Sequence, residues 1–143
     1  MNAPTLARIL GLLFLVAGIA GVLPWTASAA PMDAPVLSLD AFYRFIGGVL
    51  PVNAAQDALH LIFGVWGLIA AIGFGSAVVY CRVVTWLFLI LVVLGALPVF
   101  AFYTLFGVAP IFGWDVAFDA FIVLVAAVGG YGRGSVPAEA TPQ

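Results

Sequence analysis

Long apolar runs, separated by short segments that hold most of the polar residues, prolines and turns, dominate this sequence. Apolar runs of about 18 residues or more are typical of membrane-spanning helices. Four such runs occur, at about 6–24, 54–74, 80–100 and 114–132. At about 1.5 Å per residue, each run reaches roughly 27–31 Å, which matches the hydrocarbon layer of a bilayer. The pattern therefore predicts an all-α membrane protein with four transmembrane helices.

One pattern occurs twice. Arg8 begins a stretch that closes on Leu23-Pro24, and Arg82 begins a similar stretch that closes on Leu97-Pro98, at an offset of 74 residues. A second similarity, at an offset near 60, matches 41–43 with 101–103 and 48–52 with 107–111. We therefore expect two parallel two-helix repeats, about 6–74 and 80–131, related by a pseudo-twofold axis along the membrane normal.

We expect the repeats to form one transmembrane domain, 1–133, followed by a disordered cytoplasmic tail at 134–143. Residues 25–40 have no match in the second half, so we expect them to be an inserted, solvent-exposed loop. Short aromatic segments at 41–50 and 101–109 precede the second and fourth runs, and we expect them to lie at the membrane interface. Small residues four apart favour helix contacts in lipid. The pairs are Ala17/Gly21, Gly67/Ala71 and Ala126/Gly130.

The first run has a second interpretation. Arg8, the apolar residues 9–23 and the small residues Ala27-Ser28-Ala29 also resemble a cleavable signal peptide. Residues 82–98 match this run but lie in mid-chain, where no signal peptide can be. We therefore expect 8–24 to be a permanent helix, with cleavage of 1–29 as the alternative.

The arginines predict the orientation, because positive charge resists translocation. With four spans, Arg8, Arg82 and Arg133 fall on one side and only Arg44 falls on the other. Both termini are therefore expected in the cytoplasm.

Composition narrows the class of protein further. The 143 residues are 66% hydrophobic and 7% charged, against about 25% charged in soluble domains. The net charge of −2 gives no basis for nucleic-acid binding. Cys81 is the only cysteine, which excludes an internal disulfide or a two-cysteine redox pair. No cofactor is predicted.

The most informative polar residue is His60, the only histidine, which lies about six residues into the second run. Its equivalent in the second repeat, at an offset of 59, is Asp119. Ionisable groups inside a membrane span usually face the bundle interior and pair. We therefore expect a hydrogen bond or ion pair between His60 and Asp119, close to the pseudo-twofold axis.

Four further polar residues lie close by in the sequence: Asp57 and Asp115 one turn before His60 and Asp119, and Asn53 and Gln56 in a near capping box. Together these six residues predict a polar cluster near the outer mouth of the bundle. It could relay protons, bind a metal, hold a polar ligand, or serve only as a clamp that fixes helix register. One histidine with scattered acids is poor metal spacing, so no metal and no catalytic residue are predicted.

At this point the sequence resembles a known family. Pro51-Val52-Asn53 followed by residues 60–68, and residues 105–110 followed by Gly113-x-Asp115, are similar to the domain-of-unknown-function 4383 family of small bacterial four-helix membrane proteins. Asp57 stands where that family often has a second Asn, and Asp119 stands where it usually has a second histidine. The resemblance covers about 5–131 and implies a topology, in the inner membrane of a bacterium, but no activity.

The sequence therefore predicts a small non-catalytic membrane protein, structural or accessory in type. Its expected partners are the lipid bilayer and a larger membrane complex. The alternative is a small transporter or proton-relay protein that uses the pocket around His60 and Asp119. A membrane redox enzyme is disfavoured by the single cysteine.

Overall fold

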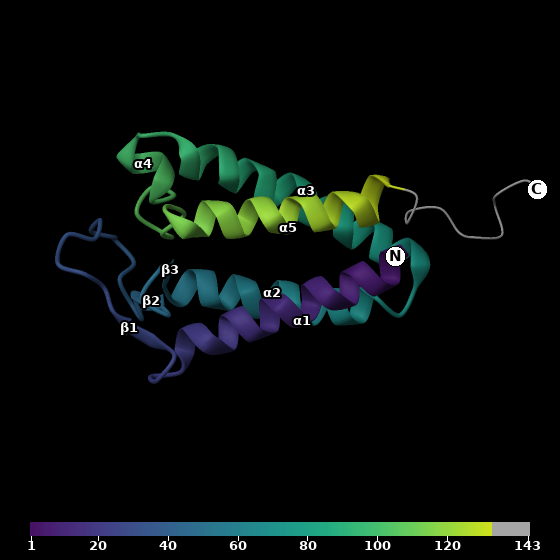
Figure 1. Ribbon diagram of the computed structural model, residues 1–143, viewed down its shortest axis with the longest axis horizontal. Coiled ribbons are helices and arrows are strands. Elements are labelled where there is room, and N and C mark those ends of the chain that lie inside the picture. The colour runs from purple at the N-terminus through teal and green to yellow at the C-terminus, as the bar shows by residue number, and fades with distance from the viewer. Residues whose placement is uncertain (133–143) are drawn as a thin grey trace, which may run out of the picture.

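The computed structural model describes residues 1–132, so Arg133 and the predicted tail 134–143 lie outside the described residues. Long helices run along the molecule, and a small sheet and one short helix lie at one end (Figure 1). We call this the sheet end; the N-terminus and the end of the last helix lie at the opposite, terminal end (Figure 1). The elements are α1 (Ala3–Val22), β1 (Ala27–Ala29), β2 (Arg44–Ile46), β3 (Leu50–Val52), α2 (Ala54–Ala70), α3 (Phe74–Ala96), α4 (Phe100–Tyr103) and α5 (Trp114–Tyr131).

Three helices, α1, α3 and α5, are long and apolar enough to cross a membrane. The fourth apolar helix, α2, has 17 residues and is shorter. Together they give a mostly helical membrane protein in which large apolar side chains point outward on every long helix. Such side chains favour contact with lipid.

The helices begin and end where local chemistry dictates. Asn2 caps α1 by accepting a hydrogen bond from the Thr5 backbone N–H at 3.1 Å, and Pro4 occupies the first turn, where its missing N–H has no cost. At their other ends, α1 and α3 stop just before Leu23-Pro24 and Leu97-Pro98. A residue that precedes proline is disfavoured in helical conformation, which explains both endings.

The boundaries of the third helix differ from those expected. It begins at Phe74 rather than near residue 80, so Arg82 lies two turns inside α3 and not in the turn before it. Arg82 Nε donates a hydrogen bond to the Gly130 carbonyl at 2.9 Å. A cation at the C-terminal end of α5 is favoured by the helix dipole, and this contact explains why the arginine sits within the helix.

A three-stranded antiparallel sheet, in the order β1-β2-β3, occupies part of the region expected to be loop and interfacial segment. Gly47 and Gly48 both have positive φ and join β2 to β3 in a turn closed by the Val49 N–H to the Ile46 carbonyl at 3.2 Å. Ile46 pairs with Leu50, so the loop has three residues, and glycine tolerates the positive φ that the first two of them adopt. Residues 41–50 are thus strand and turn, whereas 101–109 contain the short α4 and further turns.

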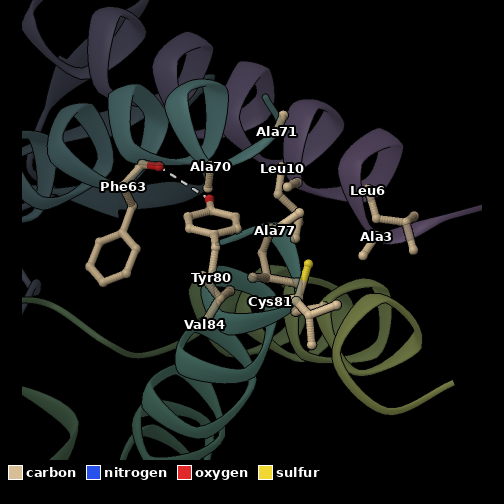
Figure 2. Close-up of a cluster of buried hydrophobic side chains, with 14 of the residues drawn as sticks. Ala3, Leu6, Leu10, Phe63, Ala70, Ala71, Ala77, Tyr80, Cys81 and Val84 are labelled. Carbon is tan, nitrogen blue, oxygen red and sulfur yellow. Dashed lines mark hydrogen bonds between the residues drawn. The ribbon is translucent and has the colours of Figure 1, made fainter. Parts of the chain in front are cut away.

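The helices pack in two close pairs, α1 with α2 and α3 with α5 (Figure 1). Gly11 permits the close approach of the first pair, since a Cβ there would lie 2.9 Å from the Gly64 carbonyl oxygen and 2.9 Å from the Leu68 nitrogen. Between the pairs, Leu6 and Leu10 of α1 face Cys81 of α3 in the apolar core of the terminal end (Figure 2).

Candidate functional site

The polar residues near the start of α2 and α5 are buried at the sheet end of the bundle. All six predicted site residues are at most 6% exposed. Three of them, Asn53, Gln56 and Asp115, form hydrogen bonds that we call the polar clamp.

Asn53 joins three parts of the chain. Its Oδ1 caps α2 by accepting a hydrogen bond from the Gln56 backbone N–H at 3.1 Å. Its Nδ2 donates to the Leu39 carbonyl at 2.8 Å and to the Val108 carbonyl at 2.7 Å. Asn53 is fully buried. The cap predicted from the sequence is thus present, and the same side chain also fixes the two loops that precede α2 and α5.

Gln56 and Asp115 connect the two helix pairs. Gln56 Nε2 donates a hydrogen bond to Asp115 Oδ1 at 2.8 Å. The predicted capping box had the Gln56 side chain returning to its own helix, but the side chain crosses from α2 to α5 instead. This hydrogen bond joins the two helix pairs at the sheet end of the bundle.

His60 makes no direct bond to Asp119, contrary to expectation. Within residues 1–132, neither side chain forms a hydrogen bond or ion pair, and His60 Nδ1 is buried without a partner. The His60 ring stacks on Phe14 at a centroid distance of 5.7 Å and meets the edge of Phe118 at 6.4 Å. The hydrogen bond between the helix pairs is made one turn earlier, by Gln56 and Asp115. These two residues are also 59 positions apart in the sequence, as His60 and Asp119 are.

Asp57 lies against α1. Gly21 provides the room for it, because a Cβ at this position would overlap the Asp57 carboxylate. Both carboxylate oxygens are buried, and neither accepts a hydrogen bond from the described part of the chain. Arg44 of β2 is the charged residue whose Coulomb interaction reaches Asp57. The sequence predicted Arg44 on the same outer side as this cluster, but it did not predict the sheet that brings Arg44 toward Asp57.

His60 and Asp115 share a pocket that the sequence did not reveal. The pocket has a volume of about 170 Å³, and apolar residues of α1, β2, β3 and α5 form its walls. The contribution of α1 and of the strands could not be foreseen, since it depends on how the sheet folds against the helices. No group of three or more His, Cys, Asp or Glu side chains in residues 1–132 is placed to hold a metal ion.

The sequence was compared with known proteins. The profile of the family described as "Domain of unknown function (DUF4383)" matches residues 5–132. No curated protein and no solved structure matches the chain. The matched region includes α2, α3, α5, the whole polar clamp and all of α1 except its first two residues. The chain therefore belongs to the DUF4383 family.

Proposed function

We propose that this protein is a non-catalytic membrane protein of structural or accessory type, held together by the polar clamp and associated with a larger membrane complex. The observation that carries the proposal is that the polar residues of the clamp form hydrogen bonds within the protein. Asn53, Gln56 and Asp115 are bonded to loops and to one another across the helix pairs. Such bonds fix the packing of helices in lipid, where few other directional forces are available.

The architecture that we propose is four spans in two parallel repeats. Similar helix contacts at corresponding positions of the two repeats support this architecture. Gly21 of α1 lies against Asp57 of α2, and Gly95 of α3 lies against Val116 of α5. These residues correspond at the offsets of 74 and 59 residues found in the sequence.

Contacts between equivalent residues further support a pseudo-twofold axis. Phe14 and Phe88, 74 residues apart in sequence, have ring centroids 5.0 Å apart. Gln56 and Asp115, which are 59 residues apart, share a hydrogen bond. Residues that meet their own equivalents lie close to a twofold axis, so these two pairs support an axis that passes between them through the bundle. The proposed topology places both termini in the cytoplasm of a bacterium, with the protein in the inner membrane.

The apolar core argues against the alternative of a transporter or proton relay. Buried side chains fill the terminal half of the bundle between the helix pairs, among them Leu10, Tyr80 and Val84 (Figure 2). The Tyr80 hydroxyl is itself occupied, donating to the Phe63 carbonyl at 3.1 Å. A path for ions would have to cross this packed layer.

Association with a larger complex is supported by the outer faces. Large apolar side chains project from each long helix, including Ile62, Trp86 and Leu124. These faces suit lipid and the apolar surface of another membrane protein equally well.

Two measurements test the proposed function. The tagged protein, expressed at its natural level and extracted in mild detergent, is expected to migrate with a larger assembly whose members can be identified by cross-linking and mass spectrometry. Purified protein in liposomes is expected to leave a proton gradient intact. The transporter would be favoured instead by two results together. The protein would migrate alone at every expression level, and it would carry a proton flux that His60→Phe abolishes.

A further inference from the structure

The terminal end of the molecule carries positive charge that no acidic side chain of residues 1–132 balances. Arg8 lies in α1 and Arg82 in α3, both in the half of the bundle that holds the N-terminus (Figure 1). The five aspartates lie toward the sheet end, in the loop before β2 or in the first two turns of α2 and α5: Asp33, Asp40, Asp57, Asp115 and Asp119. This separation of charge makes the terminal end complementary to an anionic partner.

Arg82 is held against α5 in a way that leaves its outer nitrogens available. Its Nε donates a hydrogen bond to the Gly130 carbonyl at 2.9 Å. Gly130 provides the room, since a Cβ there would lie 2.9 Å from Arg82 Cγ. The guanidinium carbon lies 5.3 Å from the centroid of the Tyr131 ring. A guanidinium has five N–H donors, and the four on the Nη atoms of this exposed arginine have no acceptor within residues 1–132.

Tyr131 supplies a further donor beside the guanidinium. Trp86 Nε1 donates a hydrogen bond to the Tyr131 hydroxyl oxygen at 2.6 Å. An indole N–H can only donate, so the tyrosine accepts in this bond and its own O–H proton is available for a ligand. Two kinds of donor therefore meet on the outer surface of the α3–α5 pair. A phosphate, with several acceptor oxygens and negative charge, fits such a pair of donors.

The depth of these donors in the bundle matches that of lipid phosphates. The 18 residues of α5 end with Gly130 and Tyr131. At about 1.5 Å per residue this helix is roughly 27 Å long, which is close to the thickness of the hydrocarbon layer. Its last residues therefore reach the membrane interface, where tryptophan and tyrosine are enriched.

A row of apolar side chains continues from Arg82 along α3 into the hydrocarbon layer. Trp86, Ile90 and Val93 follow at helical spacing and are each more than half exposed. From Arg82 to Val93 the row is roughly 16 Å long, about one leaflet of a hydrocarbon core of about 30 Å. A lipid acyl chain can lie along this row, whereas a soluble anion or an acidic peptide would leave it uncovered.

The first repeat has the equivalent arginine without the aromatic donors. Arg8 corresponds to Arg82 at the offset of 74 residues. Leu12 and Ile72 occupy the positions equivalent to Trp86 and Tyr131. Positive charge alone would make the two repeats alike, so a site built from charge and aromatic donors together occurs only around Arg82 among these two positions.

We propose that Arg82 and Tyr131 bind the phosphate of an anionic phospholipid, whose acyl chain lies along Trp86 and the row that follows it. An anionic lipid is favoured over a zwitterionic one, because the second has a cationic group beside its phosphate and the terminal end is already positive. This inference goes beyond the accessory role and does not depend on it.

The test measures contact between lipids and Trp86 in nanodiscs. The other three tryptophans are replaced by phenylalanine, and lipids with brominated acyl chains quench the fluorescence of Trp86 on contact. Brominated phosphatidylglycerol is expected to be preferred over brominated phosphatidylcholine by about fivefold, the order expected for one arginine at an anionic membrane surface. Inorganic phosphate, compared with chloride at equal ionic strength, is expected not to reduce this preference.

Three variants locate the site. Arg82→Gln is expected to make the two lipids quench equally. Arg8→Gln is the matched control, which removes the same charge from the equivalent position and should retain most of the preference. Tyr131→Phe keeps the ring and removes only the hydroxyl, so it should lower the preference, and it decides the matter if Arg82→Gln does not fold.

Several outcomes would overturn the proposal. Equal quenching by the two lipids before Arg82 is changed would exclude an anionic-lipid site, and equal losses in Arg82→Gln and Arg8→Gln would show a general effect of charge. An unchanged preference in Tyr131→Phe would exclude the hydroxyl as a donor to the phosphate. Loss of the preference in inorganic phosphate would assign the site to a free anion and not to a lipid.

Discussion

At the scale of single residues, His60 is held by rings and not by a hydrogen bond. Phe14 stacks on it and Phe118 meets it edge-on, while its Nδ1 has no partner in the described part of the chain. The histidine therefore contributes to the fold mainly as a flat side chain that fills space between α1, α2 and α5.

This packing role makes His60→Phe and His60→Ala behave differently. His60→Ala should lower the free energy of unfolding by about 2–4 kcal/mol, because removing a buried ring leaves a cavity. His60→Phe keeps the ring and removes the unpartnered nitrogen, so its stability should equal or exceed that of the wild type. Reversible unfolding in mixed detergent micelles measures both. Equal losses in the two variants would mean that the imidazole makes an essential polar contact.

Tyr43, in the segment before β2, predicts a pH effect. Burial raises the pKa of its phenol. The hydroxyl neither donates nor accepts a hydrogen bond within residues 1–132. The unfolded phenol ionises near pH 10, while the folded one retains its proton to higher pH. Above about pH 10 the unfolded state therefore loses the phenol proton while the folded state keeps it. Because ionisation then favours the unfolded state, the free energy of unfolding falls as the pH rises.

Comparison of wild type with Tyr43→Phe isolates that contribution. The variant should lose less stability than the wild type between pH 9 and 11, measured as the change in unfolding midpoint. Parallel curves for the two proteins over this range would contradict the role assigned to the buried phenol.

At the scale of elements, the α1–α2 contact depends on glycine. Gly11 has no room for a Cβ, since backbone atoms of α2 approach it from the other side. Gly11→Val should therefore separate α1 from α2 and lower the free energy of unfolding by about 1–3 kcal/mol. Gly75, in the first turn of α3, has nothing within 4 Å of a built Cβ. Gly75→Ala is the matched control and should be neutral or stabilising by up to about 1 kcal/mol. Similar losses in both variants would contradict a tight α1–α2 contact.

The sequence predicted the helices better than the elements between them. Apolar runs of spanning length and proline-terminated ends are local signals, and they located α1 and α5 to within a few residues, while the predicted start of α3 was six residues too late. The sheet was missed because β1 and β2 are far apart in sequence and pair only after the intervening loop folds back. The Gly47-Gly48 pair is the one local signal for a hairpin in this region, because both residues have positive φ.

The sequence predicted six polar residues inside the bundle, and all six are buried, but it did not predict which of them bond to one another. Burial of the six polar residues followed from the cost of exposing them to lipid. The partner of each residue depends on where the helices cross, which no spacing along a single helix fixes. The expected pair, His60 and Asp119, lies one turn from the pair that bonds, Gln56 and Asp115.

At the scale of the whole molecule, the proposed topology places the sheet end outside the cell and the turn between α2 and α3 inside. Cys81 is buried and can be replaced by alanine to give a cysteine-free background. Met32→Cys, in the first loop, should react with a membrane-impermeant maleimide in intact cells. Ile72→Cys, in the exposed turn after α2, should react only after permeabilisation. The reverse pattern would invert the topology, and reaction of both residues in intact cells would contradict a membrane-spanning α2.

The polar clamp joins the two helix pairs through the hydrogen bond between Gln56 and Asp115. A double-mutant cycle with Gln56→Ala and Asp115→Ala, measured by unfolding in lipid nanodiscs, determines the energy of this bond. We expect a coupling energy of about 0.6 kcal/mol and at most about 1.7 kcal/mol, as for side-chain hydrogen bonds between membrane helices. For His60→Ala with Asp119→Ala we expect a coupling near zero. Coupling between His60 and Asp119, with none between Gln56 and Asp115, would show that the clamp does not join the helix pairs.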